Sequence, residues 1–293
     1  MSWRVVMVAK PSKLDYSLGY MVVRDVESTT KVHLSEVSVL IIENTRCSVT
    51  TALLSRLIEE KIKVIFCDEK RNPISELTAY YGSYDCSQRL KNQLKWPTEM
   101  RQQMWTLIVE EKIRNQSRLL QLYKLSQYEL LDKYIDELEF NDSTNREGHA
   151  AKVYFNALFG LKFTRNSEDP INAALNYGYS LILSAFNREI VSNGYLTQLG
   201  LFHDNMFNQY NLSCDLMEPY RPAIDYVVKE NDIKEFTREE KIEIIKTLNR
   251  ETEIDGKINT LLNSIKIYCK SIFNALDEQE MSLIKFPIMN YEL

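Results

Sequence analysis

The sequence predicts an α+β protein of more than one domain, with a small N-terminal β domain followed by a larger all-α catalytic domain. Short β-branched runs separated by turn residues fill the first part of the chain, as is typical of strands. From about residue 86 onward, apolar residues recur at helical spacing instead. We therefore expect a β domain over 1–70, a linker over 71–85 and a helical domain over 86–293.

Five β-branched runs predict the strands of the first domain. They lie at residues 5–8, 20–23, 31–34, 37–42 and 63–67. Between them, Ser48 can cap a helix that extends to Glu60, because apolar residues there recur every three or four positions. Asn72-Pro73 then indicates the start of the connector.

Amphipathic runs predict the helices of the second domain. They lie at residues 86–96, 98–125, 127–138, 144–159, 169–192, 197–210, 215–229, 237–249 and 253–275. Asp169-Pro170 is a favourable helix start, with a capping carboxylate and a proline in the first turn. Asn193-Gly194 is a favourable stop.

Composition excludes several classes of protein. The 293 residues are 44% hydrophobic and 26% charged, which is ordinary for a globular chain. The five cysteines are scattered and form no CxxC pair, so neither a disulfide framework nor a structural zinc site is indicated. No apolar stretch approaches a membrane span and no leader pattern begins the chain, so we expect a cytoplasmic protein with no membrane partner. With eight glycines and no phosphate loop, nucleotide hydrolysis and dinucleotide oxidation are poor candidates.

One segment of this acidic chain is cationic. The net charge of −5 argues against a nucleic-acid partner, yet residues 86–128 carry 8 basic and 3 acidic side chains. Basic helices suit contact with a DNA backbone, although a salt-bridged bundle surface explains the same pattern. The side chains that we expect to contact DNA are Arg89, Lys112, Arg114, Arg118, Arg146 and Arg221.

Three acidic residues and one histidine are candidates for a metal site. Asp215 and Glu218 stand at i and i+3, where a helix places both carboxylates on one face. Glu147 and His203 are the other candidates, and such an oxygen and nitrogen ligand set suits Mg²⁺ or Mn²⁺. The alternatives are a solvated helix face, a first-turn glutamate that offsets the helix dipole after a Ser143 or Thr144 cap, and a hydrogen-bonded core histidine. Spacing alone leaves open whether these residues meet.

Four motifs, in order, resemble those of a known family. They are Asn145-Arg146-Glu147-Gly148-His149-Ala150-Ala151, Asp169-Pro170-Ile171-Asn172-Ala173-Ala174-Leu175-Asn176-Tyr177-Gly178-Tyr179, Gly200-Leu201-Phe202-His203 and Asp215-Leu216-Met217-Glu218-Pro219-Tyr220-Arg221-Pro222. The chain is similar to the CRISPR-associated endonuclease and integrase, protein one of that system, and its motifs look most like the type II branch. The resemblance implies that Glu147, His203 and Glu218 are the catalytic metal ligands. Asp215 would be an alternative ligand or a support of His203.

The resemblance also implies a reaction and partners. Relatives form homodimers through the β domain and join CRISPR-associated protein two, and other type II adaptation proteins are possible partners. In spacer acquisition for antiviral defence, the 3′ hydroxyl of a prespacer attacks double-stranded DNA at the leader and repeat boundary by transesterification. Two alternatives are a metal-dependent nuclease that acts on branched or single-stranded DNA without integration, and a non-catalytic helical DNA-binding scaffold.

Overall fold

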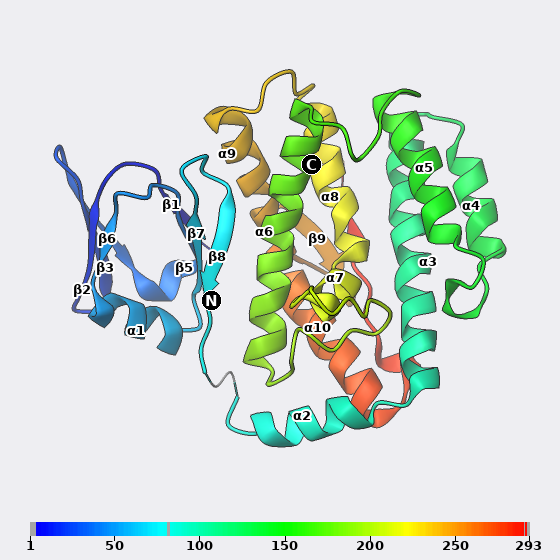
Figure 1. The fold of residues 1–293 in the computed structure, drawn as a ribbon, viewed down its shortest axis with the longest axis horizontal. Helices are drawn as coiled ribbons and strands as arrows, with labels where there is room; N and C mark the ends of the chain where they lie inside the picture. The colour runs from blue at the N-terminus through cyan, green and yellow to red at the C-terminus, as the bar shows by residue number, and fades with distance from the viewer. Residues whose placement is uncertain (1–3, 81–82, 290, 292–293) are drawn as a thin grey trace. The chain divides into compact units, whose positions relative to one another are not determined.

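The computed structural model describes residues 4–80, 83–289 and 291. The chain divides into two compact units, Met1–Gly82 and Ser83–Leu293, and each is described by itself. The N-terminal unit is built of strands and the C-terminal unit mainly of helices (Figure 1). This confirms the predicted fold class.

Two four-stranded sheets and one helix form the N-terminal unit. The first sheet has the order β1 (Arg4–Val8), β5 (Val37–Ile42), β7 (Lys63–Cys67) and β8 (Pro73–Leu77), with β1, β5 and β7 parallel. The second has the order β4 (Thr29–His33), β3 (Tyr20–Arg24), β2 (Lys13–Ser17) and β6 (Ser48–Val49). Helix α1 (Thr51–Glu59) turns Leu53 and Leu57 into the core.

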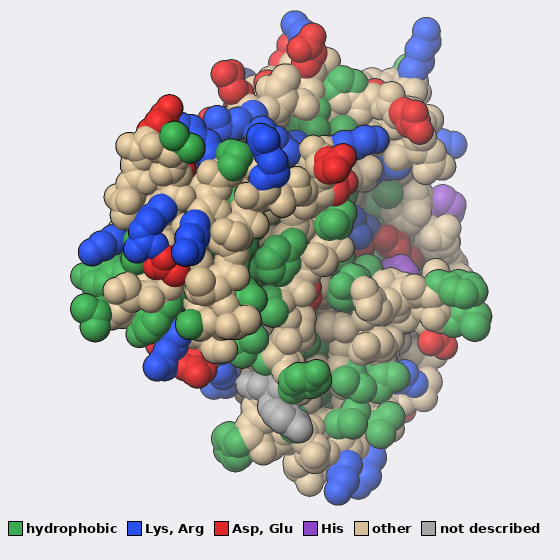
Figure 2. Space-filling model, turned by 60° about the vertical axis from the view of Figure 1, so that its left-hand side comes forward, with side chains coloured by type: hydrophobic (Ala, Val, Ile, Leu, Met, Phe, Trp, Pro, Cys, Tyr) green, Lys and Arg blue, Asp and Glu red, His purple; other side chains and the backbone are tan. Residues whose placement is uncertain are grey.

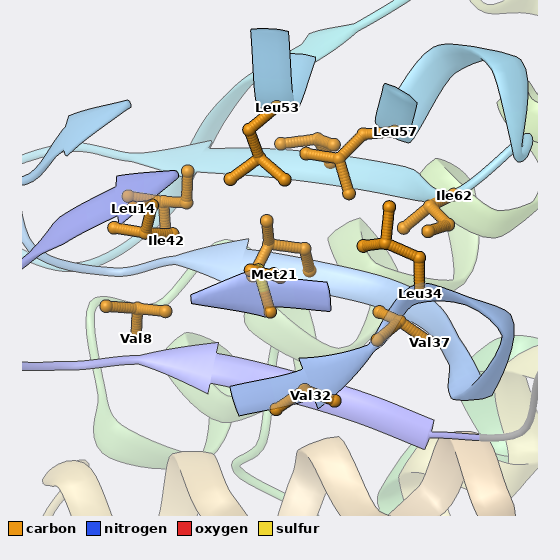
Figure 3. Close-up of a cluster of buried hydrophobic side chains, with 12 residues drawn as sticks. Val8, Leu14, Met21, Val32, Leu34, Val37, Ile42, Leu53, Leu57 and Ile62 are labelled. Carbon is orange, nitrogen blue, oxygen red and sulfur yellow. The ribbon is translucent and has the colours of Figure 1, made fainter. Parts of the chain in front are cut away.

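A cluster of aliphatic side chains forms the main core of this unit. Figure 3 shows Leu53 and Leu57 directed at Met21 of β3, with Ile42 and Val37 of β5 close by. These side chains are at most 5% exposed, and each fully buried aliphatic side chain contributes about 1.5–3 kcal/mol. Burial of this kind is what the β-branched patterning of the sequence encodes.

All five predicted strands are present. The described part of this unit has three further strands, β2, β6 and β8, and its helix starts later than the sequence predicts. Strand β2 has little β-branched character and is defined by its hairpin with β3, whose turn places Leu18 and Gly19 at positive φ. The helix cap is Thr50, whose Oγ1 accepts from the Leu53 N–H at 3.4 Å, and not Ser48. Strand β8 lies inside the predicted linker 71–85 and pairs with β7.

Long helices dominate the C-terminal unit. Its α-helices are α2 (Cys86–Lys95), α3 (Thr98–Leu122), α4 (Tyr128–Asp136), α5 (Arg146–Phe159), α6 (Pro170–Ser192), α7 (Asn211–Leu216), α8 (Arg221–Glu230), α9 (Arg238–Lys246) and α10 (Leu261–Glu278). Figure 1 shows α8 between α6 and α3, with α4 and α5 on the other side of α3. Gly178 permits close packing of α6 on α8, because a Cβ there would lie 2.4 Å from Ile224 Cγ2.

The C-terminal unit is not entirely helical, which corrects two predicted helices. Residues predicted as the start of the helix at 253–275 form a hairpin of β9 (Glu251–Ile254) and β10 (Lys257–Thr260), and β11 (Ile288–Met289) pairs with β9. The Asp255-Gly256 turn, with positive φ at both residues, encodes that hairpin. Residues 197–210 form an irregular loop and no helix. Their apolar spacing is helical, but side chains hold the loop instead; Thr197 Oγ1, for example, donates to Gln209 O at 2.7 Å.

None of the helices in the described ranges is both long and apolar enough to cross a bilayer.

Candidate metal centre

Glu147 lies in the first turn of α5, and side-chain caps fix that turn. The Asp142 carboxylate accepts a hydrogen bond from the backbone N–H of Arg146 at 2.6 Å and another from that of Glu147 at 3.1 Å. Asn145 is the N-cap residue. Both caps have positive φ, which Asn and Asp tolerate better than other non-glycine residues. The expectation of a cap at Ser143 or Thr144 is therefore wrong. The Asn and Asp residues that directly precede α5 are the sequence signal that indicates the true caps.

Glu218 lies in a short 3₁₀ turn, Glu218–Tyr220, directly after α7. Helix α3 anchors this turn, because Asn115 Nδ2 donates to the Pro219 carbonyl at 3.0 Å. Arg221, at the start of α8, donates from Nε to Glu218 Oε1 at 2.9 Å. The carboxylate is almost fully buried, so these neighbours determine its charge.

Lys112 of α3 brings the two glutamates together. Its Nζ lies 2.5 Å from Glu147 Oε1 and 2.5 Å from Glu218 Oε2. The two carboxylate oxygens are therefore at most about twice that distance apart. Three separate elements, α3, α5 and the 3₁₀ turn after α7, thus converge on one buried cation position.

Burial and charge act in opposite directions at this position. Burial alone would raise the pKa of Glu218, but the charges of Arg221 and Lys112 hold it below its ordinary value. Burial alone would lower the pKa of Lys112, but Glu218 and Glu147 raise it. Both groups are therefore charged at neutral pH, and the site is a built ionic cluster rather than a solvated helix face.

His203 is fixed in the loop that precedes α7. Its Nδ1 lies 2.5 Å from Asp215 Oδ1, and its ring meets Trp105 edge-on at a centroid distance of 5.7 Å. The hydrogen bond to Asp215 raises the pKa of the imidazole, and the nearby charges of Glu218 and Glu147 add to the rise. With Nδ1 held as the donor, Nε2 is the nitrogen available to bind a ligand.

Asp215 has both carboxylate oxygens occupied by the His203 loop. Besides the imidazole, they accept from the backbone N–H groups of Leu201 at 2.6 Å, Phe202 at 3.1 Å and His203 at 3.2 Å. Gly200 permits this approach, because a Cβ there would lie 2.8 Å from Asp215 Oδ2 and 2.3 Å from the His203 carbonyl oxygen. The geometry favours Asp215 as the support of His203, one of the roles that the sequence left open.

The structure brings the candidate residues together in two pairs. Glu147 and Glu218 meet at Lys112, and His203 meets Asp215. Among the residues that the structure describes, no three His, Cys, Asp or Glu side chains are arranged as a ready metal shell. Figure 2 shows a histidine together with acidic side chains in a hollow of the surface.

The residues nevertheless suit a divalent cation. The Lys112 ammonium is a stand-in cation: it marks a place where two carboxylates from different elements already surround a positive charge. Carboxylate oxygens and one imidazole are ligands of Mg²⁺ and Mn²⁺. Glu147, Glu218 and His203 would hold such a cation, and three protein ligands would leave coordination positions open for substrate.

The basic residues predicted to contact DNA are engaged with carboxylates. Lys112 is buried between two of them and does not offer Nζ to a DNA backbone in this arrangement. The ion pairs of the others are Arg89 with Asp85 and Asp277, Arg114 with Glu110 and Glu111, Arg118 with Glu111, Arg146 with Glu137, and Arg221 with Glu218. This supports the alternative of a salt-bridged surface, whereas DNA contact by the exposed arginines stays a prediction.

A family model and a full-length relative match this chain. The model described as CRISPR associated protein Cas1 matches residues 6–252. The CRISPR-associated endonuclease Cas1 of Neisseria meningitidis serogroup C is 32% identical over 293 residues, covering 98% of this chain and 96% of that protein. The chain belongs to the Cas1 family. The resemblance found in the motifs is thereby confirmed, and so is the prediction of a CRISPR-associated endonuclease.

Solved structures agree with the Cas1 fold. A casposase bound to integration product is 18% identical, with a TM-score of 0.76 and coverage of 96% of this chain and 92% of that chain. A Cas6-RT-Cas1--Cas2 complex is 19% identical, with a TM-score of 0.71; the match covers 99% of this chain and 36% of that one. At these identities the likeness establishes the arrangement of helices and strands.

Proposed function

We propose that the chain is a metal-dependent DNA integrase of CRISPR adaptation, which inserts prespacer DNA into the repeat array by 3′-hydroxyl transesterification. The observation that carries the proposal is the convergence of Glu147 and Glu218 on one buried cation position, with the oriented His203 imidazole in their electrostatic range. The integration product held by the casposase neighbour supports strand joining as the reaction.

The site residues divide the work of such a reaction. Mg²⁺ or Mn²⁺ bound here would polarise the phosphodiester and offset the charge on the leaving oxygen. Glu147 and Glu218 would hold the cation, and Asp215 would keep His203 Nδ1 as a donor and leave Nε2 as the nitrogen that can bind it. Arg221 fixes the second oxygen of Glu218 and limits its rotation. Water competes with the 3′ hydroxyl as the nucleophile, so strand joining requires that bound DNA keeps water away from the reacting phosphate.

Partners follow from the family and from the neighbours. The Cas1--Cas2 complex supports CRISPR-associated protein two as a partner, and the casposase bound to integration product supports DNA as a partner. Double-stranded prespacer and leader-repeat DNA are the substrates that the proposed reaction requires. Dimerisation through the N-terminal unit, and contact with further adaptation proteins, are part of the same proposal. The Neisseria relative supports the type II branch.

Strand joining tests the proposal. Prespacer DNA, a supercoiled repeat-bearing plasmid, protein two and Mn²⁺ are combined with the wild type, His203→Ala or Glu147→Ala. We expect joined product from the wild type and a loss of at least about 100-fold in each variant, because charge neutralisation at the reacting phosphate is worth several kcal/mol. His149→Ala is the matched control, since this histidine is exposed on α5 two residues from Glu147.

Three outcomes would count against the proposal in different ways. Joining that survives His203→Ala removes the metal site from the mechanism. Plasmid cleavage by the wild type without joined product favours the nuclease that does not integrate. DNA binding without cleavage or joining favours the non-catalytic scaffold.

A further inference from the structure

We infer that Lys112 is a built-in competitor of the divalent cation: it occupies the cation position of the metal-free protein and thereby sets the metal affinity of the site. The inference rests on the proposed metal site. It assigns a role to a residue that the sequence pattern had placed among the DNA contacts.

The first argument is where the ammonium lies. The Lys112 side chain is only 8% exposed, and its Nζ is equally close to one oxygen of Glu147 and one of Glu218. An ammonium on a flexible stem is a compact point charge, and here it lies between the two carboxylates that would hold the cation. A lysine that merely neutralised one glutamate would not need to lie between two.

The second argument is the local charge. Glu147 and Glu218 supply two negative charges, and Lys112 and Arg221 supply two positive charges. These four groups are therefore balanced without a metal, and the Asp142 and Asp215 carboxylates lie nearby. A divalent cation placed beside the same two glutamates would adjoin the Lys112 ammonium, and the repulsion between two adjacent cations in a largely buried site is costly. Metal binding therefore requires the ammonium to leave the position between the carboxylates.

The third argument is that Arg221 does not share this role. Its Nε binds the other oxygen of Glu218, and its guanidinium lies over the Tyr179 ring at 4.6 Å from the centroid. Arg221 is thus held in place from two sides and can stay when a metal enters. Lys112 has no such second anchor in the contacts described, because both of its ion pairs are with the glutamates that would bind the metal.

The test is direct measurement of Mn²⁺ binding by the full-length protein without DNA, with electron paramagnetic resonance reporting free Mn²⁺. Lys112→Met removes the competing charge and keeps the aliphatic stem. We expect it to bind Mn²⁺ at least about tenfold more tightly than the wild type, the effect of one moderately strong charge interaction. Lys152→Met is the control for net charge, because Lys152 is exposed on α5 and its removal should change affinity by less than about twofold.

Stability supplies a second readout. Without Lys112 the two carboxylates repel each other in the metal-free protein, so Lys112→Met should unfold at lower temperature than the wild type in chelator. Saturating Mn²⁺ should then raise its melting temperature more than that of the wild type, because a tighter ligand stabilises more. If Lys112→Met does not fold in chelator, Lys112→Gln, which can still donate to both glutamates, replaces it in the Mn²⁺ titration.

The outcomes separate this inference from the proposed function. If the folded Lys112 variants bind Mn²⁺ no more tightly than the wild type, while His203→Ala weakens binding, the competitor role is wrong and the metal site stands. If neither the wild type nor any variant binds Mn²⁺, the metal site is wrong and the competitor role falls with it. Tighter binding confined to Lys112→Met and Lys112→Gln supports the inference.

Discussion

The two units of this chain differ in how their buried charged side chains are arranged. Around Met21 and Leu53, the N-terminal unit closes on aliphatic groups from two sheets and a helix (Figure 3). This unit also buries Glu43 and Lys63, which form ion pairs with Arg71 and Glu76. The C-terminal unit has a comparable apolar core and buries Lys112 with Glu218, while its buried Asp215 bonds to the His203 loop. Apolar packing tolerates small shifts, whereas a buried charge without its partner is strongly destabilising. The contrast indicates that apolar packing dominates the first unit, whereas buried charges also hold the candidate site residues of the second in place.

The sharpest way to break this contrast is to remove one buried charge from the C-terminal unit. In Asp215→Asn an amide replaces a carboxylate that accepts from three backbone N–H groups and the His203 imidazole. We expect the unfolding free energy to fall by about 3–5 kcal/mol and strand joining to be lost. Urea unfolding followed by tryptophan fluorescence measures the loss, and Asp204→Asn on the same loop is the control. Wild-type stability in Asp215→Asn would show that the carboxylate is not needed to order the loop.

A cavity in the N-terminal unit should lower stability without touching the metal site. Leu53→Ala should cost about 2–5 kcal/mol, the usual range for truncation of a fully buried leucine. Hydrogen exchange of the β5 and β7 amides would report the loss, and Val26→Ala, at an exposed position, is the control. Mn²⁺ affinity should stay unchanged. A parallel loss of Mn²⁺ affinity would mean that the two units are energetically coupled.

The smallest expected effect concerns a buried acid that lies outside the candidate ligands. Burial raises the pKa of Asp225 to about 6, although it accepts hydrogen bonds from Tyr154, at 2.8 Å, and Tyr179. The folded carboxyl therefore binds a proton more readily than the unfolded one, and its contribution to stability declines as the pH rises from about 4 to about 6.

Comparison with Asp225→Asn isolates that contribution, because an amide does not titrate. The stability of the wild type relative to this variant should fall by about 2 kcal/mol between pH 4 and pH 7. Urea unfolding at several pH values measures the difference. A constant difference across this range would show that Asp225 has an ordinary pKa in the folded protein.

Prediction from sequence succeeded where local pattern decides structure. The β-branched runs located β1, β3, β4, β5 and β7, and the Asp169-Pro170 signal located the start of α6. It failed where tertiary contacts decide. Strand β2 owes its existence to a hairpin partner, and the loop at 197–210 follows an apolar pattern that a helix would also satisfy.

The candidate site shows the same division. Residue types and family motifs selected Glu147, His203 and Glu218, but no spacing in the sequence shows that two of them share a lysine. Lys112 stands in a cationic segment, and its side chain faces inward only because α3 passes the first turn of α5 and the 3₁₀ turn at Glu218. Charge patterning along a helix cannot identify which cation is buried.

The way in which Asp215 holds its loop has a practical consequence. The carboxylate fastens the segment from Leu201 to His203, whereas Met206 and Phe207 a few residues later are 87% and 89% exposed. The position of the His203 imidazole thus does not depend on the exposed part of the loop at Met206 and Phe207. Once the partly exposed Cys47, Cys86 and Cys214 are replaced, a cysteine at position 206 or 207 would carry a fluorophore a few residues from the candidate site and report the arrival of DNA in real time.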